Sequence, residues 1–473
     1  MRGILSWGGY VPQHRLDRQA IAAVAGSGGG SGARSVAAYD EDAVTLAVAA
    51  ARLALAESPA EPATLWFATT DPPYLDRTNA TAVHAALRLD RRVAAYDAVG
   101  SVRSAAGALR AAVQAPEPVL VVGADLRGGL PGGPDEAAGG DGAAAILIGG
   151  DEDGPVLAEV LATVSVTEEF LDRWRLPGEP ASRLWEERFG ETRYSGLGAE
   201  ALKLALAEAG ADAAAVRYLA VAGLHGKAVR GVAAASGLPA ERIADRLEST
   251  VGNTGAAQPG LLLAATLERL RAEPPGQLVV LLVLADGADA IVLRTTAALA
   301  AYRPARPVAA QVAAGAPVAY GTYLAWRGML RVEPPRRPEP ARPSSSAANR
   351  NLAWKFGLVG SRGDDGVVRM PPSPLDSAAV PMASATGTIV TFTVDRLAYS
   401  PSPPIVFAVV DFDGGGRLPI ELTDVRAGEV RIGDRVELTF RRLFTGEGVH
   451  NYFWKARPAW TAEGPASTAE GEG

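Results

Sequence analysis

The sequence predicts an α/β layered domain over about the first 300 residues, followed by a small all-β barrel. Continuous apolar runs alternate there with longer Ala/Leu-rich helical patterns, which is typical of strands covered by helices on both faces. From about residue 352, apolar and polar residues alternate around glycine turns, which indicates half-buried strands. A Pro/Ser/Arg-rich stretch, residues 331–351, lies between the two patterns and is expected to be an extended, semi-rigid linker.

The first part contains candidate strands and candidate helices in alternation. Each strand is a short apolar run bounded by turn residues, and each helix has apolar positions at helical spacing. The candidate strands are 63–70, 118–125, 142–150, 216–223, 277–287 and 289–296, and the candidate helices are 40–57, 199–210 and 260–273. Because a strand, a Gly-rich turn, a helix and closing strands recur, we expect two duplicated halves, residues 1–164 and 165–300.

The remainder of the chain divides into three predicted segments. Residues 301–351 contain a short helix, expected within 317–330, and then the linker. Residues 352–460 carry about five strand patterns, which favours a barrel of the OB type. Residues 461–473 are expected to form a disordered tail.

Composition limits the functions that this chain can have. The net charge is −7 and the sequence pI is about 5.4, which argues against non-specific attraction to nucleic acid or anionic membrane. Cysteine is absent, so the chain has no disulfide, no thiolate metal ligand and no cysteine nucleophile. The first apolar run is too short for a signal peptide, and no uninterrupted run reaches ~18 residues. We therefore expect a cytoplasmic protein without a membrane span.

The stretch AAYDAVGSVRSAAGAL, residues 94–109, has the form of a glycine–serine turn in front of a buried helix. Turns of this kind present nucleophiles at a helix N-terminus, where the helix dipole lowers the pKa of a thiol. The residue expected at the sharpest point is Val102, whose alkyl side chain offers no such chemistry. The pattern predicts an active-site elbow that lacks a nucleophile.

Several segments of the first part together resemble bacterial and archaeal hydroxymethylglutaryl-CoA (HMG-CoA) synthases. The N-terminal GILSWGGYVPQHRLDRQAIAAV carries this resemblance, as do GGDGAAAILIG, SVTEEFLDRWRLPGE and WEERFGETRY further along. GLHGKAVRGVAAASGLPAERI and VGNTGAAQPGLLLAATLE resemble the His and Asn motifs shared with ketoacyl-ACP synthase III. The resemblance covers roughly residues 2–297 and implies a thiolase-like fold with α-β-α-β-α layers.

The resemblance assigns functional positions to four residues of this chain. Enzymes of this family transfer an acyl group from a thioester to a Cys, and HMG-CoA synthases use a Glu for acid/base work. Alignment of the elbow on the family pattern puts Val102 at the Cys position, and the strand end ATTD puts Thr70 at the Glu position. His225 in LHGK and Asn253 in VGNTG match the residues that donate hydrogen bonds to the thioester oxygen.

Alternatives remain at these positions. Ser101 or Ser104 is a candidate nucleophile beside Val102, although a one-residue displacement at an elbow aims a side chain elsewhere. Asp71 is a candidate acid next to the Glu position, and otherwise it caps the turn that follows. The matched histidine and asparagine either bind a carbonyl or CoA, or remain as hydrogen-bonded structural residues.

The C-terminal part resembles the zinc-ribbon/OB-fold proteins that partner thiolases. AWRGMLRVEPPRRPEPARP, LVGSR, GTIVTFTVDR, AVVDFDGGGRLPIELTD, IGDRVELTFRRL and YFWKARP carry this resemblance. The family pattern has paired Cys after GSR and again after a Pro pair, whereas residues 360–378 offer Gly, Asp and Ser, so no metal is expected. An OB barrel also suits single-stranded nucleic acid, but the acidic composition disfavours this alternative.

The resemblance and the replaced residues together predict an acyl-CoA-handling, HMG-CoA synthase-like subunit. The first hypothesis is a scaffold or partner of a thiolase-type acyltransferase; the second is an active acyltransferase that uses His225 and Asn253 without a covalent acyl-Cys intermediate. A coenzyme A thioester is the expected substrate or ligand, with no tightly bound cofactor. The resemblance also implies a dimer through the thiolase-like domain, with a second copy or a thiolase as the partner.

Overall fold

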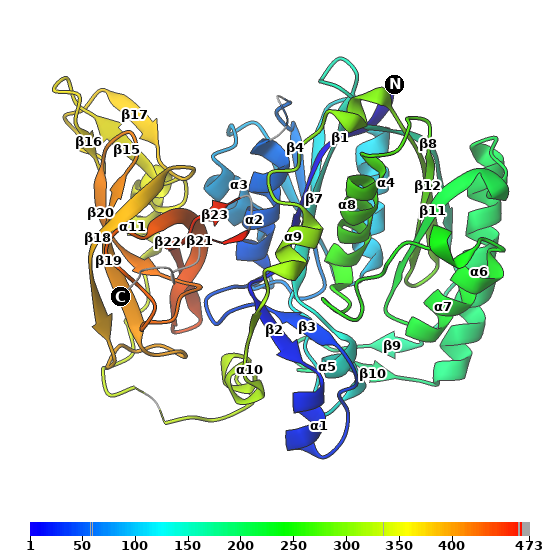
Figure 1. Cartoon of the computed structure of the whole chain (residues 1–473), viewed down its shortest axis with the longest axis horizontal. Coiled ribbons are helices and arrows are strands. Elements are labelled where there is room, and N and C mark those ends of the chain that lie inside the picture. The colour runs from blue at the N-terminus through cyan, green and yellow to red at the C-terminus, as the bar shows by residue number, and fades with distance from the viewer. Residues whose placement is uncertain (57, 59, 334, 462–463, 466–473) are drawn as a thin grey trace, which may run out of the picture. The chain divides into compact units, whose positions relative to one another are not determined.

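The structure is a computed structural model that describes residues 1–56, 58, 60–333, 335–461 and 464–465 (Figure 1). The chain divides into two compact units, which are described separately below. The sheet unit comprises residues 1–37, 49–81 and 91–320. The barrel unit comprises residues 38–48, 82–90 and 321–473.

A mixed sheet forms the centre of the sheet unit. Most of its strands are apolar runs buried on both faces, as expected of strands between helices. The spatial order is β11-β12-β13-β8-β1-β7-β6-β4-β5. The strands are β1 Arg2–Tyr10, β4 Thr64–Thr69, β5 Ala94–Val99, β6 Val119–Asp125, β7 Gly142–Gly150, β8 Ala158–Val166, β11 Val216–Gly223, β12 Leu278–Leu284 and β13 Ala288–Thr295.

The strand order repeats about the middle of this sheet. β1 pairs antiparallel with β7, and β8 pairs antiparallel with β13 in the same way. β6 and β4 continue one half as a parallel pair, and β12 and β11 continue the other half as a parallel pair. β1 and β8 connect the halves through two residue pairs. This repeat confirms the predicted duplication, and β5 extends only the first half.

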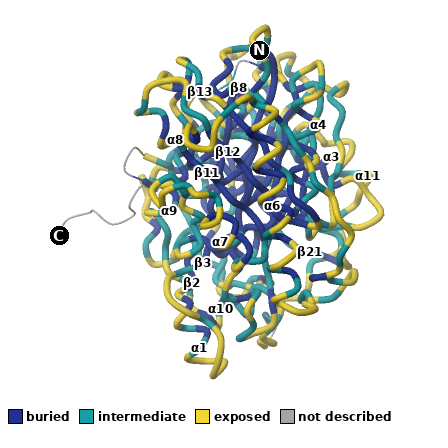
Figure 2. Tube along the Cα trace, turned by 90° about the vertical axis from the view of Figure 1, so that its right-hand side faces the viewer, coloured by how far each residue is buried: buried dark blue, intermediate teal, exposed yellow. Residues whose placement is uncertain are grey.

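Two helices lie between the halves of the sheet and form the central layer (Figure 1). They are α4 Arg103–Gln114 and α8 Gln258–Leu270. Leu109 of α4 and Leu261 and Leu267 of α8 join strands from both halves in one hydrophobic cluster. Removal of this apolar surface from water stabilises the fold by roughly 25 cal/mol per Å². Figure 2 shows buried residues concentrated in the interior, around β11 and β12.

Helices also cover the outer faces of the sheet. α6 Glu187–Glu208 and α7 Gly226–Ala235 form a second hydrophobic cluster with β11, β12 and β13. On the first half, α2 Ala43–Ala56 approaches β1 closely at Gly8. A Cβ at Gly8 would lie 2.3 Å from the carbonyl oxygen of Ala50, so only glycine permits this approach. The predicted α-β-α-β-α layers are therefore confirmed.

Short elements complete this part of the chain. Three small strands form a sheet in the order β14-β2-β3, and β9 pairs with β10 as a hairpin. These strands are β2 His14–Asp17, β3 Ala33–Val36, β9 Arg173–Trp174, β10 Arg183–Leu184 and β14 Ala316–Pro317. The short helices are α1 Gln19–Ala25, α5 Pro134–Ala138, α9 Val308–Ala313, and the 3-10 turns Ala213–Ala215, Ala240–Arg242, Gly255–Ala257 and Ala297–Ala300. The helix α3 Ala80–Leu87 begins in the sheet unit and lies mainly in the barrel unit.

A closed five-stranded barrel forms the body of the barrel unit. Its order is β18-β19-β20-β22-β21, and β21 pairs back with β18 to close it. The strands are β18 Thr386–Asp395, β19 Ile405–Phe412, β20 Arg417–Leu422, β21 Arg435–Gly446 and β22 Val449–Pro458. Alternate residues of β20, Leu418, Ile420 and Leu422, are buried in the barrel, as the period of a strand requires. The predicted OB-type barrel is confirmed.

The other elements of the barrel unit precede or follow the barrel. In the sequence, a three-stranded sheet in the order β16-β15-β17 precedes the barrel, and a short strand pair, β23 and β24, follows it. The elements are α10 Tyr320–Trp326, α11 Ser345–Arg350, α12 Leu352–Lys355, β15 Val359–Arg362, β16 Val368–Arg369, β17 Ala378–Pro381, β23 Trp460–Thr461 and β24 Gly464–Pro465.

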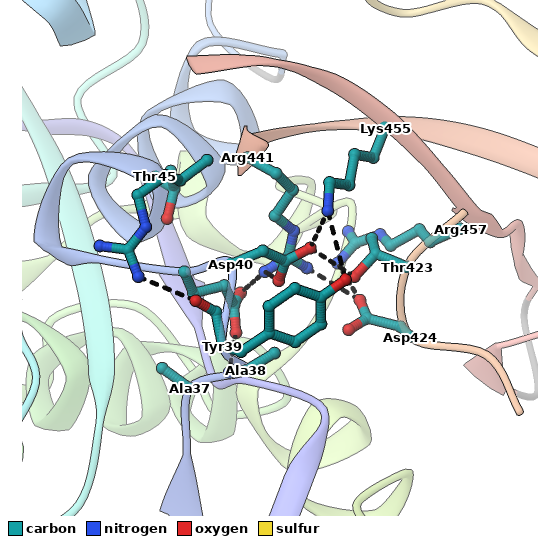
Figure 3. A network of polar contacts seen from close by, with 12 residues as sticks. Ala37, Ala38, Tyr39, Asp40, Thr45, Thr423, Asp424, Arg441, Lys455 and Arg457 are labelled. Carbon is teal, nitrogen blue, oxygen red and sulfur yellow. Dashed lines mark hydrogen bonds and ion pairs between the residues drawn. The ribbon is translucent and has the colours of Figure 1, made fainter. Parts of the chain in front are cut away.

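A buried ion network joins residues 38–48 to the barrel within the barrel unit (Figure 3). The ammonium nitrogen of Lys455 on β22 lies 2.9 Å from a carboxylate oxygen of Asp40, and neither side chain is exposed. Lys455 also contacts Glu421 on β20, and the guanidinium of Arg441 on β21 contacts Glu41. Burial opposes ionisation of Asp40, but Lys455 and Arg441 outweigh it and hold the pKa of this carboxyl below its usual value.

Neutral groups complete this network. The hydroxyl of Thr423 donates a hydrogen bond of 2.8 Å to Asp40, and the hydroxyl of Tyr452 donates one of 2.7 Å to Asp42. The backbone N–H of Arg442 donates to the carbonyl oxygen of Asp40 at 2.9 Å. Segment 38–48 therefore has both charged and backbone bonds to barrel strands.

The structure differs from the sequence predictions at several elements. The strands over 2–10, 94–99 and 158–166 were not predicted, because Gly, Ala and polar residues interrupt their apolar pattern. α6 begins twelve residues before the predicted helix at 199, since Gly and charged residues mask the periodicity there. Part of the expected extended linker is the helix α11, where the Ser344 hydroxyl accepts a hydrogen bond from the N–H of Ala347 at 3.3 Å.

The predicted tail, residues 461–473, lies mostly outside the described residues; its described part forms the strand pair β23–β24. Among the helices of the described chain, none combines the length and the apolar character that a membrane crossing requires.

The first prediction concerns Glu268 on α8, whose pKa burial raises to about 7. Its carboxylate accepts hydrogen bonds from the N–H of Val308 at 2.9 Å and the indole of Trp7 at 3.4 Å. The folded state binds the proton of the Glu268 carboxyl more tightly than the unfolded state does. The resulting contribution to the free energy of unfolding is complete below pH 4.5 and is lost as the pH rises through about 7. The free energy of unfolding should therefore fall by roughly 3 kcal/mol more in the wild type than in Glu268→Gln across this window.

Urea unfolding at a series of pH values measures this difference. Glu208→Gln, at an exposed position of α6, is the matched control and should follow the wild-type pH dependence. Parallel pH profiles for the wild type and Glu268→Gln would contradict the prediction.

Candidate functional site

The sheet unit contains a cavity of about 510 Å³ at the end of the central helix α4. The loops after β4 and β5, the β9 hairpin and the loops after β11 and β12 surround it. Their lining residues fall mainly within 70–73, 99–102, 172–178, 224–225 and 284–286. Loops that follow several strands of the same sheet thus line one cavity. Binding sites in α/β folds commonly lie at this end of the strands.

The elbow between β5 and α4 forms one wall of the cavity. Its sharp turn is at Gly100, which has φ +106°, and not at Val102 as the sequence suggested. Val102 is already helical, with φ −57° and ψ −32°, because the reversal has been completed at the glycine. Its side chain is 3% exposed, lines the cavity and belongs to the central hydrophobic cluster. An apolar surface therefore stands where the resemblance implies a thiolate.

Thr70 lines the cavity directly after β4. Its backbone N–H and its hydroxyl donate hydrogen bonds of 2.7 and 2.9 Å to the carboxylate of Asp125. The guanidinium of Arg127 donates to the same hydroxyl oxygen at 3.0 Å. The position that the resemblance assigns to a Glu thus holds a neutral side chain between a buried carboxylate and an arginine.

His225 lines the cavity at the N-terminus of α7. Its Nδ1 accepts a hydrogen bond from the N–H of Ala228 at 3.2 Å, so the ring caps the helix. Its Nε2 lies 2.8 Å from the carbonyl oxygen of Glu187 and donates to it. This pair of bonds fixes the tautomer with the proton on Nε2 and engages both ring nitrogens with backbone groups.

The side chain of Asn253, like that of His225, forms hydrogen bonds with backbone groups. Asn253 is not one of the residues that line the cavity. Its amide nitrogen donates to the carbonyl oxygen of Gly223 at 2.8 Å, two residues before His225. Its amide oxygen accepts from the N–H of Gly255 at 3.0 Å. The structure brings the two matched residues to the same loop region, with their polar atoms on backbone groups; an oxyanion role for them stays a prediction.

The alternative groups also have partners. The hydroxyl of Ser101 donates to a carboxylate oxygen of Asp286 at 2.5 Å, and that of Ser104 donates to the carbonyl oxygen of Val99 at 3.2 Å. Asp71 forms an ion pair of 3.2 Å with Arg175. Of the two serines, only Ser101 lines the cavity.

The structure adds polar side chains to the cavity that the sequence did not single out. Arg127, Arg173 and Arg175 line it together with Asp172 and Tyr194. Burial raises the pKa of Asp172, although the hydroxyl of Tyr194, which donates to it at 3.1 Å, opposes this shift. The segments LDRWR and GADLR carry most of these residues, but one sequence cannot tell an inward arginine from a surface arginine.

The region that resembles a zinc ribbon is held by polar contacts of a different kind. The hydroxyl of Ser361 donates to Asp376 at 2.7 Å and accepts from the N–H of Ser373 at 2.8 Å. Arg369 pairs with Asp365 at 2.6 Å and with Asp376 at 3.4 Å. Within the described ranges, no three His, Asp or Glu side chains gather as metal ligands do. These residues do not fit structural zinc, which requires thiolate or imidazole ligands.

Comparisons with known proteins agree with this architecture. The hydroxymethylglutaryl-CoA synthase of Methanopyrus kandleri is 30% identical over 294 residues, which cover 59% of this chain and 83% of the relative. The solved 3-oxoacyl-(acyl carrier protein) synthase III of Pseudomonas aeruginosa has a TM-score of 0.54 and 22% identity over 62% of this chain and 98% of that chain. An HMG-CoA synthase solved in complex with CoA has a TM-score of 0.56 and 19% identity over 68% of this chain and 89% of that chain.

The C-terminal region has a similarity of its own. Residues 379–441 match the C-terminal OB-fold domain of ChsH2. This match covers the first strands of the barrel unit's five-stranded barrel. The two parts of the chain are thus similar to two different kinds of protein, as the sequence predicted.

The second prediction concerns the structural role of His225 as the cap of α7. His225→Ala removes the side chain that caps α7 and should lower the free energy of unfolding by ~1 kcal/mol, whereas His225→Asn keeps a capping acceptor and should lose less. Urea unfolding of both variants measures this difference. Equal stability of the alanine variant and the wild type would contradict the capping role.

Proposed function

The chain belongs to the hydroxymethylglutaryl-CoA synthase family, and from this membership we propose that its pocket binds acyl-CoA thioesters without accepting the acyl group covalently. In this proposal the protein is a non-catalytic subunit that supports a thiolase-type acyltransferase. The solved HMG-CoA synthase that shares the fold was complexed with CoA, which supports CoA as the common part of the ligand. The side chains that line the cavity support binding without acyl transfer.

One observation carries the proposal: an alkyl side chain lines the cavity at the N-terminus of the central helix. The dipole of the 12-residue helix α4 and its free N–H groups would lower the pKa of a thiol at Val102. A valine neither attacks a thioester nor holds an acyl group. Since the sequence contains no cysteine, no neighbouring thiol replaces it.

The polar groups nearby support the same proposal. A serine nucleophile needs a base that takes its proton. His225, the histidine that lines the cavity, uses both ring nitrogens for hydrogen bonds to backbone groups. Thr70 offers a hydroxyl where acid/base work would require a titratable group, and Asp71 is paired with Arg175. These contacts support the proposal of a thioester-binding pocket whose reactive groups are replaced.

The third prediction tests this replacement. After incubation with acetyl-CoA, intact-mass spectrometry should detect no acetyl adduct on the wild type. Val102→Cys places a thiol at the helix N-terminus in the pocket and should gain one acetyl group. Ala106→Cys, one turn further along α4 and equally buried, is the matched control and should remain unmodified.

Two outcomes would contradict the proposal. An adduct on the wild type, which peptide mapping would assign to Ser101 or Ser104, would show covalent chemistry without cysteine. Release of CoA from acetyl-CoA or acetoacetyl-CoA above the background rate would favour the second hypothesis, an enzyme that transfers the acyl group directly.

The edge of the sheet supports the proposed partnership with another thiolase-like subunit. β5 pairs with β4 on one side and forms the end of the sheet, and no strand of the described residues pairs with its other edge. Tyr96 and Val99 on β5 are 50% and 46% exposed, and the ring of Tyr96 lies 5.1 Å from that of Trp66. Apolar side chains at an open strand edge suit the two-fold pairing of strands between subunits.

The barrel supports the partnership from the other end of the chain. It matches the OB-fold domain of ChsH2, and the resemblance in sequence is to modules that partner thiolases. We therefore propose that the barrel contacts the thiolase-type partner, while the sheet unit holds the acyl-CoA.

The fourth prediction concerns the β5 edge. Tyr96→Arg adds a charge to an apolar strand edge and should shift the protein from dimer to monomer, or abolish its co-purification with a co-expressed thiolase. Leu204→Arg, at a similarly exposed position on α6, should leave assembly unchanged. Light scattering after gel filtration reports the state of each variant.

Assembly that is equally strong in Tyr96→Arg and the wild type would exclude β5 as the interface. A neighbouring thiolase that forms no complex with this protein and is fully active alone would overturn the supporting role.

A further inference from the structure

The cavity of the sheet unit contains three arginines, and two of them are already paired with carboxylates. Arg173 forms two parallel hydrogen bonds with Asp135, at 2.8 and 2.9 Å. Arg175 forms an ion pair with Asp71 at 3.2 Å. These pairs leave two guanidinium groups neutralised by the protein itself.

Arg127 differs from these two arginines in the contacts of its guanidinium. Its guanidinium makes one hydrogen bond, of 3.0 Å to the hydroxyl of Thr70, and within the described part of the chain no carboxylate lies at ion-pair distance. The nearest carboxylate in sequence, Asp125, accepts four hydrogen bonds from other donors, two of them from Thr70. Several N–H groups of Arg127 therefore remain available on the wall of the cavity.

The surroundings of Arg127 favour an anion over a neutral group. Burial lowers the pKa of Arg127 most strongly. The carboxylates of Asp125 and Asp135 act in the opposite direction, and the positive charges of Arg173 and Arg175 add to the lowering. An anion beside Arg127 would relieve this repulsion and replace the lost hydration of the guanidinium. A Glu at position 70 would have added a negative charge to that of Asp125, whereas the threonine provides only a hydroxyl.

We propose that Arg127 is a carboxylate-binding residue, and that the pocket selects acyl thioesters whose acyl group ends in a carboxylate. This inference rests on the proposed function, because it assumes that the acyl end of a CoA thioester enters the cavity. A planar guanidinium can bind a carboxylate through two parallel hydrogen bonds, which a neutral acyl end cannot accept.

The location of Arg127 favours the acyl end over the phosphates of CoA as the source of the anion. Arg127 contacts Thr70, and both share the cavity with Val102 at the N-terminus of α4. These two positions are the ones that the resemblance assigns to acyl chemistry. A contact of Arg127 with a CoA phosphate would instead affect every CoA compound equally, which the experiment below distinguishes.

The test compares succinyl-CoA with butyryl-CoA, two thioesters with acyl chains of four carbons that differ in the terminal carboxylate. Isothermal titration calorimetry on the full-length protein should give about tenfold tighter binding of succinyl-CoA, the size expected of one charged bidentate contact. Arg127→Met should abolish this preference and leave the affinity for butyryl-CoA and for CoA unchanged. Arg127→Lys keeps the positive charge but loses the planar guanidinium, so it should retain part of the preference for succinyl-CoA.

Arg294→Met, on β13 away from the cavity lining, is the control and should keep the full preference. Thermal unfolding of each variant confirms that it is folded. Equal affinity of the wild type for the two thioesters overturns the inference but not the proposed function. Equal weakening of CoA, butyryl-CoA and succinyl-CoA by Arg127→Met assigns the residue to a phosphate and also overturns it. No binding of any CoA compound to the wild type rejects both proposals.

Discussion

The pairing of Lys455 with Asp40 is the constraint on which the organisation of the barrel unit depends. Both side chains are fully buried, so each charge would be very unfavourable without the other. Loss of one partner from such a pair typically costs 3–5 kcal/mol, because the remaining charge stays buried. The pairing therefore ties a segment from the N-terminal part of the sequence to a barrel strand 415 residues later. Arg441 and Thr423 orient the same carboxylate and leave it little freedom to move.

Much of the architecture could be predicted from the sequence, because most strands of the sheet are apolar runs and the barrel strands alternate. The strand β1 was missed for a physical reason: its Gly8 is required by the close approach of α2, and glycine weakens the apolar pattern. The assignment of residues 38–48 to the barrel unit was also beyond prediction. The charged run YDED looks like a solvated surface in the sequence, and only the fold reveals that the matching cations lie on distant strands.

The candidate site could be predicted in part. Val102, Thr70 and His225 line one cavity, although they are far apart in the sequence. The contacts made by each side chain could not be predicted, since one sequence gives no distances. His225 caps a helix, and Asn253 spans two backbone groups, so both have structural reasons to remain where the family places them. Arg127 was missed because an arginine after a strand has no special pattern; its lack of a carboxylate partner is visible only in three dimensions.

The valine at the N-terminus of α4, in a chain without cysteine, has a consequence for the biochemistry of any assembly that contains these residues. Reagents that alkylate or oxidise thiols find no target in this chain. Inhibition of such an assembly by iodoacetamide or hydrogen peroxide would therefore locate the sensitive step on a partner subunit, provided that no methionine of this chain is involved. The chain thus serves as an internal standard in such an experiment, because the cavity beside α4 contains no thiol that these reagents could modify.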